Sequence, residues 1–575
     1  MTARILLRFL CPLLLLAAAP ARAQHFDWAA AGSNLNGGFS ALTVDPQGNI
    51  IAAGSVYLFS NFYHGPSWLL SSSNDSLEVH STMRPMLVVS YAPNGSINWR
   101  LEVPGCSAPR GIAIDGKGRI RVLAETDAYG RARVPGLDPI YDSRRVFLLT
   151  LSPDGKPLSA VTDTAGRLEN ATDFRVVDGA HFLVSGTRNY ADGRAYGSAA
   201  HYLVKLGEDL QPLWEQEIPL KGSGGVFDPG VRMDVAPSGD IFLAGSYLNG
   251  AQFPGSGPHD AAAVQPETEY SKHFESYVAC FGPGGKPKWV RHSGGRSILR
   301  SVNATRTGVV VGGEIVNNAA PFGRRADTTG GRRMLLASLS AGGQVGWVRS
   351  SRADKVQELT SDREGNVYAS VSSKVFDSLV FETDTLRYTF ETLIIASYAP
   401  DGAFRWVKNT RLPMNYNERV LLRSDGCGNL YVGGELWATL RMQLRWFDGA
   451  FIRGDAYGDA PFVARIRNTL PETVARRGAA DRASCRISPA PWTISNFPNP
   501  FAAHTTIRYR TTYDDAVSLQ LYDMGGRLVS VLQAPQQRPA GTHLLPFSRN
   551  GLAAGAYLLV LRGTGATAST QVLIR

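Results

Sequence analysis

The sequence predicts an all-β protein, and three observations lead to this fold class. The chain has 60 Gly and 33 Pro among 575 residues, a content that favours frequent turns. No sustained helical periodicity appears after the amino terminus. One strand–turn–strand phrase recurs seven times and then stops before a final segment of different character. Together these features predict a seven-bladed β-propeller followed by a small C-terminal immunoglobulin-like β-sandwich.

Residues 1–23 have the features of a signal peptide. Arg4 and Arg8 form a positive region, a mostly apolar run follows, and a small-x-small cleavage site occupies residues 21–23. The apolar run is shorter than the about 20 residues that a membrane-spanning helix needs, with an uncleaved anchor as the alternative. We expect the mature chain to begin near Gln24 and to contain no transmembrane segment.

The net charge of the whole chain is +10, and it falls to +7 when Arg4, Arg8 and Arg22 leave with the signal peptide. This excess is scattered along the chain, so a solvated basic surface is a better interpretation than a patch for acidic polymers. Nucleic acid is not expected as a ligand, because the protein is expected to be exported.

The first half of each repeat is a strand, a turn rich in Asp and Gly, and a second strand. Four copies place an Asp three residues before the turn Gly, where its carboxylate can accept hydrogen bonds from turn amides. The spacing lacks the alternating oxygen ligands of a calcium loop, so turn capping is the favoured interpretation. The four residues are Asp45, Asp115, Asp362 and Asp425, and the seven turn glycines are Gly48, Gly118, Gly179, Gly239, Gly308, Gly365 and Gly428.

The second half of each repeat is another hairpin, which usually ends in Trp. A Trp at one place in successive units indicates packing between neighbouring sheets and not a platform for ligands. The copy ending near Ser159 lacks the Trp. The five that carry it end at Trp99, Trp214, Trp289, Trp347 and Trp406.

The seventh repeat lacks its last strand, and the amino terminus supplies a match. After "PFVARIRNTL" no Gly-x-x-x-Trp strand follows, whereas "HFDWAAAG" near the amino terminus carries Trp28 at the expected place. We therefore expect this segment to complete the last blade and to remove the open edges of the sheet.

Residues 24–470 resemble the exported bacterial propeller repeats called SBBP-type repeats. The shared phrases are Asp-x-x-Gly-Asn-hydrophobic and Gly-x-x-x-Trp. This resemblance implies a propeller but no particular activity, because such propellers serve many roles.

The last part of the chain is a different module. Residues 471–490 are polar and rich in Arg and Ala, as in a linker, and residues 491–575 contain alternating strands separated by Gly turns. Several motifs occur in a fixed order: Phe497-Pro498-Asn499-Pro500-Phe501, Tyr522-Asp523 with Gly526-Arg527, Ala540-Gly541, and Leu552 with Gly555 and Tyr557.

These motifs resemble the type A C-terminal sorting domain of the bacterial type IX secretion system. The resemblance implies two-stage export, with that secretion machinery as a partner of the C-terminal domain. It also implies that the rest of the protein is then released or attached to the cell surface, and the sequence leaves both fates open.

No catalytic, cofactor-binding or metal-binding residue is assigned from the sequence. The ten His residues are never closer than fourteen positions apart, and neither a Gly-x-Ser-x-Gly elbow nor a Walker loop occurs. We expect a secreted or cell-surface binding or scaffold protein without a cofactor. The first alternative is a secreted enzyme that acts on polysaccharide at the channel mouth. A less favoured alternative is a quinoprotein dehydrogenase, because "FGPGGKPKW" resembles the Gly-x-x-x-Trp docking phrase of propellers that bind pyrroloquinoline quinone.

Two long connections, residues 57–85 and 247–275, are the places where we expect a surface glycan or a protein ligand to bind. Aromatic side chains in the first connection can stack on sugar rings or pack onto their own blade, and both interpretations stay open. These side chains are Tyr57, Phe62, Tyr63 and Trp68.

Four cysteines remain after removal of the signal peptide, and export permits disulfides. Cys280 falls in an alternating strand pattern, "SYVACF". Cys427 and Cys485 are candidates for a bridge between the propeller and the linker, although the sequence does not fix the pairing.

Overall fold

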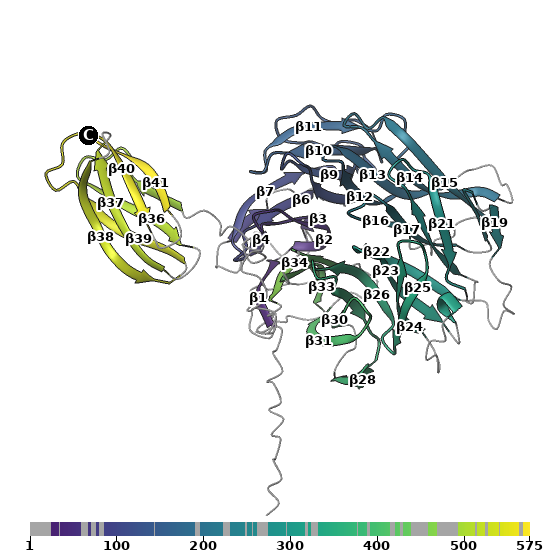
Figure 1. Cartoon of the computed structure of the whole chain (residues 1–575). Coiled ribbons are helices and arrows are strands. Elements are labelled where there is room, and N and C mark those ends of the chain that lie inside the picture. The colour runs from purple at the N-terminus through teal and green to yellow at the C-terminus, as the bar shows by residue number, and fades with distance from the viewer. Residues whose placement is uncertain are drawn as a thin grey trace, which may run out of the picture.

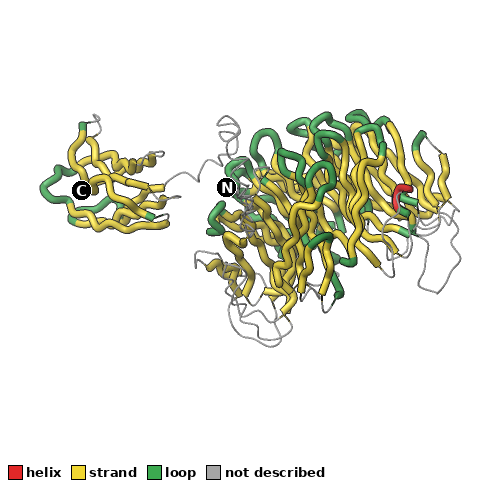
Figure 2. Tube along the Cα trace, turned by 60° about the horizontal axis from the view of Figure 1, so that its bottom comes forward, coloured by secondary structure: helices red, strands yellow, loops and turns green. Residues whose placement is uncertain are grey.

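The computed structural model confirms the all-β fold class (Figures 1 and 2). The structure describes residues 25–33, 35–58, 67–70, 76–79, 85–107, 109–142, 144–189, 196–221, 230–247, 250–255, 257–260, 274–294, 296–316, 320–323, 332–375, 378–387, 392–413, 420–425, 429–438, 458–467, 493–511, 515–523, 527–539, 541–562 and 567–575. The expected signal peptide, the linker, Cys427 and Cys485 lie outside these residues.

Seven sheets of the described repeat region are each built on four antiparallel strands, and a separate two-stranded sheet accompanies them. Blades 1 to 3 are β2(Leu35–Val44), β3(Ile50–Leu58), β6(Met86–Tyr91) and β7(Ile97–Val103); β8(Gly111–Ile114), β9(Ile120–Glu125), β10(Val146–Leu151) and β11(Pro157–Thr162); and β12(Ala171–Val177), β13(His181–Asn189), β14(Tyr196–Leu206) and β15(Pro212–Lys221).

Blades 4 to 7 follow in the same pattern. They are β16(Arg232–Val235), β17(Ile241–Tyr247), β20(Glu275–Phe281) and β21(Pro287–His292); β22(Ser297–Ala304), β23(Gly308–Val316), β24(Arg332–Ser340) and β25(Val345–Ser351); β26(Lys355–Ser361), β27(Val367–Ser372), β30(Thr392–Tyr398) and β31(Phe404–Pro413); and β32(Leu421–Ser424), β33(Asn429–Ala438), β34(Gly458–Arg467) and β1(His25–Ser33).

The ring closes through the amino-terminal strand. The first strands of successive blades contact one another in order, and β32 of blade 7 contacts β2 of blade 1 (Figure 1). Strand β1 pairs with β34, with Trp28 opposite Arg465. The closing strand is therefore the one that the missing strand of the seventh repeat predicts.

Each middle strand is buried on both faces, because its two sides pack against two neighbouring blades. In β6 and β20, every residue is buried, whereas β7 and β21 on the outside are mostly half-buried. This arrangement explains why the second and third strands read as continuous apolar runs and not as strict alternation. The cores are correspondingly shared between blades; one of them joins Ala53 and Val88 of blade 1 to Val122 and Leu149 of blade 2.

The repeated Trp residues link one blade to the next. The indole nitrogen of Trp347 in blade 5 donates to the Pro400 carbonyl of blade 6 at 3.0 Å, and its ring covers Gly402 of the same turn. Gly402 has a φ of 80°, and a Cβ there would lie 2.5 Å from Trp347 Cγ. This confirms that Trp347 is a packing residue. Other copies of this link are Trp28 to Pro93, Trp99 to Pro153, and Trp289 to Ala341.

Two of the long connections contain an extra hairpin that joins the preceding blade. Strand β4(Ser67–Leu70), within blade 1, pairs with β1 of blade 7 and with β5(Ser76–Val79). Strand β18(Gly250–Phe253), within blade 4, pairs with β15 of blade 3 and with β19(Gly257–Asp260). These hairpins cover outer edges, which are otherwise open to pairing with other chains. Blade 6 carries a separate hairpin, β28(Ser378–Phe381) and β29(Asp384–Arg387).

The C-terminal module is a sandwich of two sheets around its own core. One sheet has the order β35-β36-β39, and the other β38-β37-β40-β41. Side chains of both sheets meet in one apolar cluster, including Ile507 of β36 and Leu559 of β40. The strands are β35(Thr493–Phe497), β36(His504–Thr511), β37(Asp515–Asp523), β38(Leu528–Arg538), β39(Gly541–Ser548), β40(Gly555–Arg562) and β41(Thr567–Ile574).

Helix is nearly absent from the described residues, where only the short 3-10 turn η1(Pro321–Gly323) occurs. None of the described helical residues forms a segment long and apolar enough to cross a membrane. Cys106 and Cys280 are buried free thiols, and Cys280 lies in β20 as its pattern predicts.

Candidate functional site

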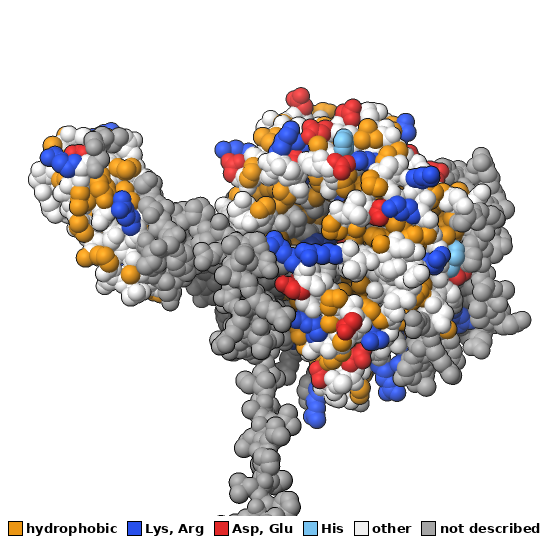
Figure 3. Space-filling model, viewed as in Figure 1, with side chains coloured by type: hydrophobic (Ala, Val, Ile, Leu, Met, Phe, Trp, Pro, Cys, Tyr) orange, Lys and Arg blue, Asp and Glu red, His pale blue; other side chains and the backbone are white. Residues whose placement is uncertain are grey.

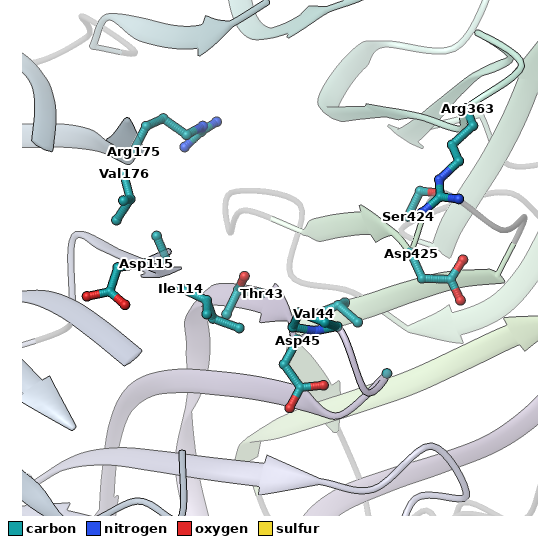
Figure 4. Close-up of a pocket in the computed structure, with 13 residues that line it drawn as sticks. Thr43, Val44, Asp45, Ile114, Asp115, Arg175, Val176, Arg363, Ser424 and Asp425 are labelled. Carbon is teal, nitrogen blue, oxygen red and sulfur yellow. The ribbon is translucent and has the colours of Figure 1, made fainter. Parts of the chain in front are cut away.

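A cavity of about 650 Å³ opens where the first strands of several blades end (Figure 4). Blades 1, 2 and 7 contribute the ends of β2, β8 and β32, while β12 of blade 3 and the turn after β26 of blade 6 complete the wall. The volume falls within the range of about 300–1,000 Å³ that is typical of small-molecule sites. The lining residues are Thr43, Val44, Asp45, Pro46, Gly48, Ala113, Ile114, Asp115, Arg175, Val176, Arg363, Ser424 and Asp425.

Three of the repeated Asp residues line this cavity, and each caps its own turn. Asp45 Oδ1 accepts the backbone N–H of Gln47 at 2.9 Å and of Asn49 at 2.7 Å, and its Oδ2 accepts Asn49 Nδ2 at 2.7 Å. Asp425 binds the backbone and side-chain amides of Asn429 in the same way. These contacts confirm that the two carboxylates cap their turns.

The capping Asp residues occupy one continuous arc of the ring. Asp362, Asp425, Asp45 and Asp115 belong to blades 6, 7, 1 and 2, which are neighbours once the ring has closed. Blade 4 has Ala236 at the corresponding turn. The cavity lies over three of these turns, so the capping Asp residues are concentrated on one part of the channel mouth.

Among the three Asp residues that line the cavity, Asp115 has the most hydrogen-bond and ion-pair partners. Its carboxylate accepts the backbone amides of Lys117 and Arg119 and pairs with the guanidinium groups of Arg119 at 2.7 Å and Arg121 at 2.9 Å. Burial acts to raise the pKa of Asp115, but these hydrogen bonds outweigh it and the pKa is lowered. Asp115 is therefore a fixed, ionised acceptor at neutral pH.

Arg175 of blade 3 supplies positive charge on the same side of the cavity as Asp115, across the open space from Asp425 (Figure 4). Its Nε donates to Asp234 Oδ1 at 3.2 Å, and its Nη1 donates to Asp173 and to the Phe174 carbonyl. Burial opposes the charge, but Asp173, Asp234 and Glu358 raise the pKa of Arg175. Its Nη2 donates to no described residue, and Figure 4 shows the guanidinium directed into the open space.

A second ion pair lies deeper along the inner strands. Arg423 of β32 donates from Nη1 to Glu358 of β26 at 2.7 Å and from Nε to the Leu42 carbonyl at 3.2 Å. Glu358 is 3% exposed. The described carboxylates of this channel are thus held by arginines or by turn amides.

The arginines of this site do not stand out in the sequence. Arg175 lies between Phe174 and Val176 in an inner strand, where a polar residue between apolar ones signals a side chain that faces the channel. That signal predicts a direction but not the neighbours, because Asp234 and Glu358 come from other blades.

The aromatic side chains singled out from the sequence do not take part in this site as described. Tyr57 and Trp68 belong to β3 and β4, but their side chains, like Phe62 and Tyr63, lie outside the described residues. Within the described part of the chain, no group of three or more His, Cys, Asp or Glu is arranged to hold a metal ion.

Comparison with known families identifies one part of the chain. Residues 495–575 match the model of the secretion system C-terminal sorting domain. A search of curated proteins found no match. A protein that carries this sorting domain is secreted or displayed at the cell surface, as the motifs of the last module predict. The likeness of residues 24–470 to SBBP-type repeats stays a prediction.

Several solved structures are similar to this chain. They include the polysaccharide lyase Uly1 (12% identity, 75% of this chain and 90% of that chain, TM-score 0.38). Another is the α-L-arabinofuranosidase Arb93A from Fusarium graminearum (8%, 77% and 98%, TM-score 0.36). A third is the PQQ domain of pyranose dehydrogenase from Coprinopsis cinerea (11%, 76% and 94%, TM-score 0.31). At these identities and TM-scores the likenesses carry no inference about activity.

Proposed function

We propose that the propeller is an exported binding module and that the cavity at the channel mouth holds a glycan. The observation that carries this proposal is the cavity itself, which is lined by the fixed carboxylates of three turns and by the guanidinium of Arg175. The type IX secretion machinery exports the propeller, and the sorting domain is the export signal.

The chemistry of the wall suits hydroxyl groups. A sugar hydroxyl both donates and accepts, so it can donate to Asp45 or Asp425 and accept from Arg175 Nη2. Val44 and Ile114 offer apolar contacts to the C–H faces of a ring. Because the turn amides fix the carboxylates beforehand, binding orders few side chains and loses little conformational entropy.

The state of the carboxylates favours binding over catalysis. Two-carboxylate glycoside hydrolysis needs one carboxylic acid that stays protonated because its pKa is raised. The pKa of Asp115 is lowered instead. Asp45 accepts hydrogen bonds from the amides of its own turn, which hold its carboxylate in place.

One observation nevertheless keeps the enzyme as a second candidate. Asp45, Asp115 and Asp425 lie around one mouth, and glycoside hydrolysis uses a pair of carboxylates. The two candidates differ in whether the polysaccharide is cut.

The test is to incubate the purified chain, without residues 1–23, with immobilised polysaccharides. Both the retained protein and the reducing ends released are measured. We expect retention on at least one polysaccharide without new reducing ends. New reducing ends would establish the enzyme. If Arg363→Ala, a change in the cavity wall, is retained as well as the wild type, the glycan does not bind in the cavity. Lys156→Ala is the control, because Lys156 is 78% exposed and lies outside the cavity.

A further inference from the structure

Exposed large hydrophobic side chains are concentrated in the C-terminal module. Among the described residues, six of them lie within residues 493–575, against five in the much longer propeller. Scattered exposed hydrophobics are ordinary on a protein surface, whereas a group of them marks a site of interaction. The six are Phe497, Leu528, Val531, Leu544, Leu558 and Leu573.

Four of the six share one side of the four-stranded sheet. Strand pairing sets Leu528 and Leu558 on either side of Tyr522, and Val531 opposite Gln520. Leu573 pairs with Ala556, two residues from Leu558 on the same face. We call Leu528, Val531, Tyr522, Leu558 and Leu573 the outer sheet face. Figure 3 shows hydrophobic side chains along the visible side of the module.

The sandwich does not need these side chains for its own core. The alternate residues of the same strands, such as Leu521 and Leu559, are fully buried between the two sheets. On the outer sheet face, Leu528 is 47% exposed and Leu558 is 38% exposed. Apolar residues on both sides of a strand indicate that the second side also becomes buried, against something outside the module.

The charge around the outer sheet face is positive. Arg562 lies on the same face, with its guanidinium 5.9 Å from the centre of the Tyr522 ring. Residues 493–575 contain seven Arg, no Lys, three Asp and no Glu, which gives a net charge of +4. The complementary surface is therefore apolar with carboxylates at its border.

A second copy of this chain is a poor occupant. Pairing the face with itself sets two positively charged faces against each other, each with its Arg562, and like charges repel. The face has four exposed apolar side chains that are 36–51% exposed, whereas a standard stable interface involves about 20–30 residues on each side. A small face of this kind suits a transient contact, as recognition during export requires.

We propose that the outer sheet face docks onto a protein of the secretion machinery through an apolar strip bordered by carboxylates. The proposal is independent of the ligand of the propeller. It concerns which surface of the sorting domain is recognised.

The test is an export assay of the full chain in a bacterium that possesses this secretion system. The double variant Leu528→Ser/Leu558→Ser removes the centre of the face. Leu544→Ser is the matched control, because Leu544 is 67% exposed on β39 of the opposite sheet. We expect the exported fraction of the double variant to fall at least tenfold, with retention in the periplasm, while the control is exported normally.

Two further measurements keep the result interpretable. Thermal unfolding of the purified variants shows whether the module still folds, and Arg562→Glu reverses the charge beside Tyr522 without changing the apolar side chains. Arg562→Glu should reduce export and Arg562→Lys should not. Normal export of the folded double variant, or an equal loss in the Leu544→Ser control, overturns the proposal. So does a wild-type dimer that the double variant dissociates, since the face then belongs to a second copy.

Discussion

Removal of the closing Trp side chain should destabilise the whole ring. Trp28 is 5% exposed, its indole nitrogen donates to the Pro93 carbonyl at 2.8 Å, and its ring lies 6.1 Å from that of Tyr91. Trp28→Ala removes this side chain from a core shared by blades 1 and 7, and we expect a loss of about 3–5 kcal/mol in the free energy of unfolding.

The hydrogen bond can be separated from the packing with Trp28→Phe. The Pro93 carbonyl also accepts Arg465 Nη1 at 2.9 Å, so it keeps a partner when the indole is lost. We therefore expect the hydrogen bond itself to account for only about 0.5–1 kcal/mol.

The assay is urea denaturation of the purified chain, followed by circular dichroism of the propeller transition. Because the sorting domain can unfold separately, its transition is fitted as a second step. Tyr129→Ala is the control, since Tyr129 is 88% exposed and its loss should change stability by less than about 0.5 kcal/mol. A Trp28→Ala protein as stable as this control would refute the role of β1 in closing the ring.

Three other predictions concern single residues. Gly402→Ala should lower the free energy of unfolding by more than about 2 kcal/mol, because the strain of a left-handed backbone adds to the clash with Trp347. Gly136 has a similar φ and open space around it, so Gly136→Ala should lower it by only about 1 kcal/mol in the same denaturation assay. Lys355→Met should stabilise the protein by up to about 3 kcal/mol at pH 7, because burial lowers the pKa of Lys355 to about 8 from an unfolded value near 10.5. Since the unfolded chain then binds more protons, wild-type stability should rise from pH 8 to pH 10.5 and the advantage of the variant should shrink; a pH-independent difference contradicts this. Finally, millimolar calcium and chelators should leave the thermal midpoint of the propeller unchanged, because the Asp45 carboxylate is already bound by turn amides.

The fold could be predicted from the sequence, because the same strand pattern recurs in the sequence of each blade. Trp28 could be assigned to the last blade since it fills the place where Trp406 stands in the unit before. The same logic failed for the long connections. The strands β4 and β18 add to neighbouring blades through non-local pairing, and no local pattern of residues encodes which edge an inserted hairpin will join.

The candidate site was only partly predictable. The role of Asp45 followed from its distance to Gly48, because turn capping is a local interaction. Arg175 could not be assigned, because Asp234, which accepts its hydrogen bond, belongs to the next blade, and Glu358, which also raises its pKa, belongs to blade 6. Sites that depend on ring closure are therefore visible only in three dimensions.

The most direct test of glycan binding at the cavity is the retention of the wild-type chain and of Arg175→Lys on the same polysaccharide, measured side by side. Lysine keeps the positive charge near Asp173 and Asp234 but lacks the fork that presents Nη2 to the cavity. We expect the wild type to be retained without cutting the polysaccharide and Arg175→Lys, with unchanged thermal stability, to be retained at least tenfold more weakly. Equal retention of the two proteins, or release of reducing ends by the wild type, would contradict this expectation.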